Sequence, residues 1–139
     1  AAYRSQWRTP VTGNFKNYRI ISMPPPSSGG IALLQLLELV EPYDLKGMGF
    51  QSPATVHLMA EAERRVYADR AQHLGDTDFY PTPVDSLMQP AYLTSRMSDF
   101  DPAQATPSNK VAAGDFKVTL ESFETTHTSV IDAEGNAVS

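Results

Sequence analysis

Apolar residues follow helical spacing in the first half of the chain. Residues 31–40 carry apolar side chains at every position except two. Ser27 or Ser28 can cap a helix at this point, and Pro42 cannot continue one. We therefore expect a helix that runs to about Val40 and is buried nearly all round.

A longer helix is predicted from Ser52, a suitable cap, and Pro53, a suitable first-turn residue, to about Leu74. Helical spacing assigns its buried stripe to Val56, Ala60, Glu63, Tyr67, Arg70 and Leu74. Because Glu63 and Arg70 are charged, we expect them to be buried ions that pair with other segments.

Shorter patterns complete the first hundred residues. Residues 18–23 alternate as in a strand, which Pro24 ends. Thr12-Gly13-Asn14, before that strand, has the composition of a turn. A third helix is predicted over residues 91–100, and a short turn near residues 84–88.

Helical spacing is absent from the last forty residues. Proline, serine and asparagine in residues 101–114 indicate a mobile surface linker. Residues 125–132 then alternate with β-branched side chains, and residues 133–136 fit a hairpin loop with Gly135 in a left-handed conformation. Residues 137–139 begin the return strand. The pattern predicts an α+β fold that is mainly helical with a C-terminal β-hairpin.

Composition narrows the function classes. The net charge of −5 comes without any cluster of Lys and Arg, which argues against a nucleic-acid partner. The absence of cysteine excludes disulfides and thiolate metal sites. His57 and His73 lie sixteen residues apart without a ligand cluster around them, so we expect them to face solvent and predict no metal site. Residues 31–40 are too short to span a bilayer. The first residues are polar and include Arg4 and Arg8, so we do not expect them to form a signal peptide.

The run Pro24-Pro25-Pro26-Ser27-Ser28-Gly29-Gly30 has three interpretations. It can be a polyproline ligand for an aromatic groove, or a glycine-rich anion cradle at a helix start. The interpretation we favour is a rigid connector from strand to helix. The run lacks the lysine of a phosphate-binding loop, which disfavours nucleotide binding.

Thr125 is the candidate nucleophile. A threonine hydroxyl needs a base, and cleavage of the preceding peptide bond supplies one in the new α-amine of the same residue. That chemistry requires a linker, a hydroxyl residue and then a strand, which is the order found here. The alternative is that Thr125 belongs to the exposed face of an ordinary strand. His127, two residues on, is a weaker candidate for a base.

Four stretches of this sequence resemble the γ-glutamyltranspeptidases, threonine members of the N-terminal-nucleophile hydrolases. They occur in the family's order and span nearly the whole chain. The stretches are Trp7-Arg8-Thr9-Pro10-Val11-Thr12-Gly13, residues 22–30, residues 59–63 with Tyr67-Ala68-Asp69-Arg70, and Thr125-Thr126-His127-Thr128-Ser129-Val130 with Asp132 and Gly135-Asn136-Ala137-Val138.

The resemblance implies self-cleavage between Glu124 and Thr125. Residues 1–124 would then form the C-terminal part of a large subunit, and residues 125–139 the start of a small one. Mature Thr125 would transfer a γ-glutamyl group from glutathione or a similar amide to water, an amino acid or a peptide. The resemblance further implies no metal or organic cofactor, a periplasmic or secreted location, and part of a four-layer αββα sandwich.

The same resemblance places the remaining site residues outside this sequence. These are the arginine that binds the substrate α-carboxylate and the glycine pair of the oxyanion hole. We therefore expect this chain to need the remainder of both subunits for activity, and to expose sheet edges and apolar faces that favour self-association. Related acylases, poly-γ-glutamate-processing enzymes and a non-catalytic interaction module stay open as alternatives.

Overall fold

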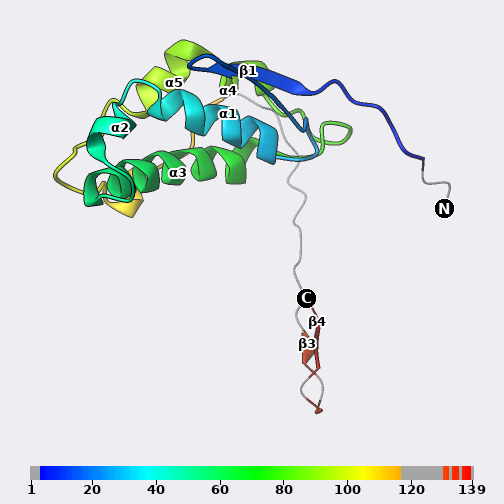
Figure 1. Ribbon diagram of the computed structural model, residues 1–139. Helices are drawn as coiled ribbons and strands as arrows, with labels where there is room; N and C mark the ends of the chain where they lie inside the picture. Colours follow the sequence, from blue (N-terminus) through cyan, green and yellow to red (C-terminus); the bar gives the residue numbers. More distant parts are fainter. Residues whose placement is uncertain (1–3, 117–129, 132, 135, 139) are drawn as a thin grey trace.

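The computed structural model describes residues 4–116, 130–131, 133–134 and 136–138 (Figure 1). Glu124, Thr125 and His127 lie outside the described residues. The elements are β1 (Val11–Phe15), β2 (Tyr18–Ser22), α1 (Gly29–Val40), α2 (Leu45–Met48), α3 (Pro53–His73), α4 (Val84–Leu87), α5 (Pro90–Arg96), the 3-10 turn η1 (Ser108–Lys110), β3 (Val130–Ile131) and β4 (Ala137–Val138).

β1 and β2 form an antiparallel hairpin, with Val11 opposite Ser22 and Phe15 opposite Tyr18. The prediction of the second strand is confirmed, but the predicted turn at residues 12–14 is wrong, because these residues pair within β1. The chain reverses instead at Lys16, whose φ of 53° is left-handed. Its backbone N–H donates to Glu41 Oε1 at 2.8 Å, which holds the turn against the end of α1.

The connector between β2 and α1 turns tightly and leads directly into the helix. Ser27 N–H donates to the carbonyl of Pro24 at 3.1 Å. Ser28 occupies the cap position, as expected, but its side chain makes no cap hydrogen bond. It accepts a hydrogen bond from Arg70 Nε at 2.8 Å instead, so this serine joins the start of α1 to α3.

α1 lies between the β1–β2 hairpin and α3 (Figure 1). The expectation that it is buried nearly all round is confirmed, since only Gly29, Leu33 and Glu38 are exposed. Its inner residues pack against α3 and α5 around one apolar core. That core consists of Ala32, Leu39, Val40, Leu58, Ala62, Val66 and Leu93.

α3 begins and ends close to the predicted residues, with Ser52 Oγ accepting from Thr55 N–H as the cap. The predicted buried stripe is wrong. Val56, Tyr67 and Arg70 are exposed, and so is Glu63. The buried residues are Leu58, Glu61, Ala62, Arg65, Val66, Asp69 and His73. The helix is rotated relative to the expectation because its charged residues find buried partners on neighbouring segments.

α5 ends at Arg96, four residues before the predicted end, and the chain then turns back along α3. The segment 101–114 lies on the surface, as expected. It is not a mobile linker, because side chains of α3 hydrogen-bond its backbone at Asp101, Thr106 and Gly114. η1 forms its only helical turn.

The C-terminal hairpin is confirmed. β3 pairs antiparallel with β4, with Val130 opposite Val138 and Ile131 opposite Ala137. Gly135, the predicted left-handed residue of its loop, lies outside the described residues. The predicted class, mixed α and β and mainly helical, agrees with the part of the chain that the structure describes.

Candidate functional site

A stripe of buried charge runs along α3. Glu61, Arg65 and Asp69 follow one another at intervals of four residues, so they share one face of the helix. Their exposed fractions are 2%, 2% and 1%. Buried charges require partners, and the segment 92–116 supplies most of them.

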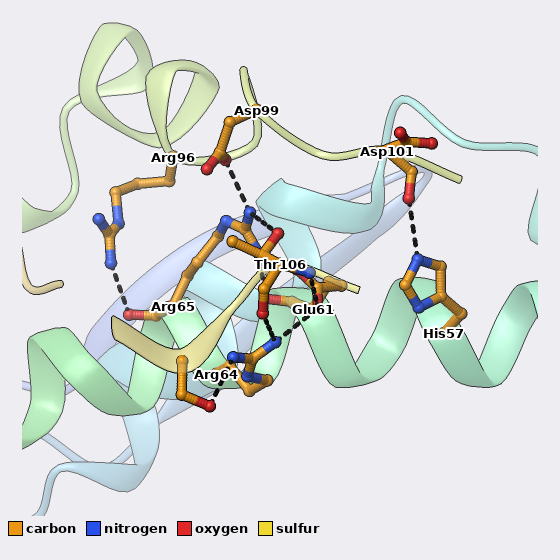
Figure 2. Close-up of polar contacts among 9 residues, drawn as sticks. His57, Glu61, Arg64, Arg65, Arg96, Asp99, Asp101 and Thr106 are labelled. Atoms are coloured by element: carbon orange, nitrogen blue, oxygen red, sulfur yellow. Dashed lines mark hydrogen bonds and ion pairs between the residues drawn. The ribbon is translucent and has the colours of Figure 1, made fainter. Parts of the chain in front are cut away.

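Glu61 is held by two arginines and by backbone. Its Oε2 pairs with Arg65 Nη1 at 2.6 Å, and its Oε1 pairs with Arg64 Nη1 at 2.7 Å (Figure 2). Thr106 N–H also donates to Oε1, at 3.2 Å. Burial by itself opposes ionisation of this carboxyl group, but the hydrogen bonds from Arg65 and Thr106 outweigh it and lower the pKa of Glu61 to about 2.

Arg65 joins α3 to the segment beyond α5. Its Nη2 donates to Asp99 Oδ1 at 2.7 Å and to Thr106 Oγ1 at 3.1 Å (Figure 2). Burial opposes the charged guanidinium, but the bonds to Glu61 and Asp99 raise the pKa of Arg65. The hydrogen bond from Arg65 in turn lowers the pKa of Asp99. All three groups are therefore ionised near neutral pH.

Asp69 forms a second polar centre one helical turn further along. Tyr92 Oη donates to its Oδ2 at 2.7 Å, and Gly114 N–H donates to its Oδ1 at 2.9 Å. Arg96 Nη2 pairs with Oδ1 at 3.2 Å and also donates to the carbonyl of Arg65 at 2.9 Å. Burial, followed by the hydrogen bond to Asp69, raises the pKa of Tyr92, so its hydroxyl stays protonated.

The two histidines of α3 each bond one backbone carbonyl. His73 Nε2 lies 2.6 Å from the carbonyl oxygen of Gly114, and His57 Nε2 lies 2.9 Å from that of Asp101. Since a carbonyl only accepts, both Nε2 atoms carry the proton. The expectation that His73 faces solvent is wrong, because it is buried and its ring meets Phe116 edge-on.

An open polar cavity of about 400 Å³ is lined by residues from both polar groups, the one around Glu61 and Arg65 and the one around Asp69. Its lining includes Arg65, Arg96, Asp99, Lys110 and Gly114. Within the described residues, no group of three or more His, Asp and Glu is arranged to hold a metal ion. No described helix is long and apolar enough to cross a bilayer.

The sequence-predicted site and the buried polar stripe are different parts of the chain. Glu124, Thr125 and His127 lie outside the described residues. The expected buried ions, Glu63 and Arg70, are exposed. Our sequence interpretation missed Glu61, Arg65 and Asp69, although their acidic, basic, acidic order at four-residue intervals is visible in the sequence.

Comparison with known proteins defines the family. The family model described as gamma-glutamyltranspeptidase matches residues 1–139. The glutathione hydrolase proenzyme of Escherichia coli K12 is 45% identical over 138 residues, which cover 99% of this chain and 24% of that protein. The Acylase ACY 1 proenzyme of Pseudomonas sp. SE83 is 40% identical over 139 residues, covering all of this chain and 24% of that protein.

The comparison of structures agrees with the comparison of sequences. The crystal structure of Helicobacter pylori γ-glutamyltranspeptidase superposes with a TM-score of 0.79 at 40% identity, covering 88% of this chain and 35% of that one. Most of this chain therefore shares its fold with a segment of that larger protein. The chain belongs to the γ-glutamyltranspeptidase family, and it spans about a quarter of the length of the curated relatives it matches.

Proposed function

We propose that this chain contains the processing junction of a γ-glutamyltranspeptidase and carries its nucleophile, Thr125. Residues 1–124 would end the large subunit, and residues 125–139 would begin the small one. The observation that carries the proposal is the match of the family model to the full length of the chain, including the Thr-Thr-His motif. Several relatives are named proenzymes, which fits a precursor that must be cut.

Self-cleavage follows from the position of Thr125 next to the bond to be broken. Its hydroxyl oxygen attacks the Glu124 carbonyl carbon, the carbon–nitrogen bond breaks, and the nitrogen takes up the hydroxyl proton. Water then hydrolyses the resulting ester, which leaves a carboxylate on Glu124 and a free amine and hydroxyl on Thr125. An α-amine titrates at about pH 7.7–8.0, so part of it is neutral and can act as a base at physiological pH.

The mature enzyme would apply the same groups to a γ-glutamyl amide of the glutathione class. The Thr125 oxygen attacks the γ-carbonyl carbon, and the α-amine passes the proton to the departing amine. Water or an acceptor amine then takes the γ-glutamyl group from the ester. This chemistry needs no metal or organic cofactor, and glutathione hydrolysis is the activity named for the E. coli relative.

The fold of the complete protein, the source of its other site residues and its location are part of the same proposal. The described helices would form part of one helical layer of an αββα sandwich, and β3 and β4 part of one of its sheets. The remainder of both subunits would supply the oxyanion hole and the residues that bind the substrate α-carboxylate. A periplasmic or secreted location, which the family resemblance implies, is part of the same proposal.

A second candidate is an acylase. It is favoured by the 40% identity to the Acylase ACY 1 proenzyme over the whole chain. The nucleophile and its processing would be the same, and only the acyl group would differ. Side-by-side assays of a γ-glutamyl anilide and a glutaryl anilide separate the two candidates.

The decisive experiment compares the full-length precursor with its Thr125→Ala and Thr126→Ala variants. We expect the wild type and Thr126→Ala to yield a fragment that begins at residue 125 and to hydrolyse the γ-glutamyl anilide. Thr125→Ala is expected to stay uncut and inactive. Activity in Thr125→Ala, or cleavage at another bond in the wild type, would remove the case for Thr125.

A further inference from the structure

α3 exposes a stripe of residues that share one side of the helix. Its members follow one another at intervals of three or four residues and are all exposed. They are Val56, Ala60, Glu63, Tyr67 and Arg70. Val56 and Tyr67 are its large apolar members, and they are 55% and 56% exposed. In the part of the chain that the structure describes, the stripe therefore presents apolar side chains to solvent.

The same helix packs a second apolar stripe into the core. Leu58, Ala62 and Val66 lie there, among residues of α1 and α5. This second stripe serves the contact of α3 with α1, on the side of α1 opposite the β1–β2 hairpin (Figure 1). A helix at the surface of a globular protein has one apolar face and a polar face opposite it. Apolar residues on two sides are typical of a helix that is covered on both.

Arg70, at one end of the exposed stripe, has no acidic partner among the described residues. Its Nε donates to Ser28 Oγ at 2.8 Å, and its guanidinium lies 5.6 Å from the centroid of the Tyr67 ring. The ion pairs formed by the described residues do not include it. Because a buried guanidinium needs an opposite charge, a surface that covered this end of the stripe would have to supply a carboxylate.

We propose that the exposed stripe of α3 is an interface with a part of the same polypeptide that lies outside this sequence. The covering surface presents apolar side chains to Val56 and Tyr67 and a carboxylate to Arg70. This inference rests on the proposed function, in which the remainder of both subunits completes the enzyme.

The size of the relatives argues for this occupant. The chain matches 24% of the E. coli protein and 35% of the H. pylori chain, so most of such a protein lies beyond the matched segment. Segments joined in one polypeptide meet at a high effective concentration, which favours them over a separate copy of the chain.

The test measures how fast a thiol on the stripe reacts with a maleimide in the folded full-length precursor. This sequence contains no cysteine, so Val56→Cys and Tyr67→Cys each place a single thiol in this segment. Mass spectrometry of the peptides locates the label. Each thiol should react at least about ten-fold more slowly than the control, because a covered thiol reacts only when the interface opens. In urea the difference should vanish.

The matched control is Gln72→Cys. Gln72 is exposed on the same helix, but it lies off the stripe, because five residues separate it from Tyr67 and turn it about 140° around the helix axis. Its thiol should react at the rate of an exposed cysteine, both in the folded precursor and in urea.

The carboxylate opposite Arg70 has its own readout. Arg70→Met and Arg70→Glu both remove the hydrogen bond to Ser28 and the contact with the Tyr67 ring. Arg70→Glu also places a second carboxylate against the first, so it should lower the melting temperature of the full-length protein more than Arg70→Met does. Equal melting temperatures would overturn the assignment of a carboxylate to the covering surface.

The outcomes separate this inference from the proposed function. Labelling of Val56→Cys and Tyr67→Cys at the rate of Gln72→Cys would overturn the interface. Protection that is lost on dilution would assign the stripe to a second copy of the chain and overturn the proposed occupant. If the precursor is not cut before Thr125, the proposed function fails. If it is cut there and the stripe is labelled at the control rate, only the interface fails.

Discussion

Glu61 and Arg65 lie one helical turn apart on α3 and form an ion pair of 2.6 Å whose side chains are 2% and 3% exposed. Each has further partners on the segment that follows α5, namely Thr106 for Glu61, and Asp99 and Thr106 for Arg65. The pair therefore joins a helix to a segment that has almost no regular structure of its own. Its loss should affect the stability of both.

Replacing Arg65 by Met should be strongly destabilising. The change leaves the buried Glu61 carboxylate without its most buried partner, which costs about 3–5 kcal/mol when a buried pair is broken on one side. Urea unfolding monitored by circular dichroism measures the difference in the free energy of unfolding.

Arg64→Met is the matched control, because Arg64 pairs with the same carboxylate from a side chain that is 30% exposed. It should cost much less than Arg65→Met. The double variant Glu61→Leu/Arg65→Met should recover part of the loss, since it leaves no unpaired buried charge. Equal losses in Arg64→Met and Arg65→Met would contradict this account of the pair.

The pKa of Glu61 predicts an acid-sensitive contribution to stability. Because the pKa falls from 4.5 to about 2 on folding, the ionised carboxylate stabilises the folded state fully above pH 4.5, and this contribution is lost as the pH falls toward 2. The difference in the free energy of unfolding between the wild type and Glu61→Gln should therefore shrink between pH 5 and pH 2. Glu63→Gln, at an exposed neighbouring position, should show a difference that barely changes over the same range. A constant difference for Glu61→Gln would refute the assignment.

Replacement of either of two adjacent glycines at the start of α1 by alanine should change the stability of the fold in different ways. A Cβ on Gly30 would lie 2.1 Å from the carbonyl oxygen of Met23 and 2.5 Å from Val11 Cγ2, so Gly30→Ala should destabilise by about 1–3 kcal/mol. A Cβ on Gly29 would meet only Ser27 Oγ, at 3.4 Å. Gly29→Ala should be neutral or stabilising by up to about 1 kcal/mol. Thermal unfolding of the two variants decides the matter, and equal melting temperatures would show that the close approach of α1 to the hairpin is relaxed.

The isolated 139-residue chain should remain intact at the Glu124–Thr125 bond or be cut only slowly. The family resemblance places the oxyanion hole outside this sequence, and one such donor is worth about 3–4 kcal/mol of transition-state stabilisation. Mass spectrometry of the purified chain over several days measures the cleavage. A fragment that begins at Thr125 and accumulates within hours would show that the nucleophile needs less assistance than we expect.

Sequence patterns correctly predicted those helices and strands that depend mainly on their own residues. α1 is buried nearly all round because its residues are apolar on every side, and α3 starts at Ser52 because a cap and a proline suit that position. The C-terminal hairpin likewise follows from local alternation and a loop signal. The four motifs that carry the family resemblance are also local, and the family match confirms the resemblance.

Local pattern could not decide which face of α3 is buried. Helical spacing favoured the stripe through Val56 and Tyr67, which the structure leaves exposed. A charged residue can be buried when partners distant in the sequence satisfy it, and the partners of Arg65 and Asp69 lie 23 to 45 residues further along the chain. Long-range hydrogen bonds also hold the segment 101–114 along α3, although its composition is typical of a mobile linker. The sequence by itself determined α1, the extent of α3 and the C-terminal hairpin, and it predicts Thr125 as the nucleophile. Only the tertiary structure decided where buried charge lies and how Gly114 is held, because those energies depend on groups that folding brings together.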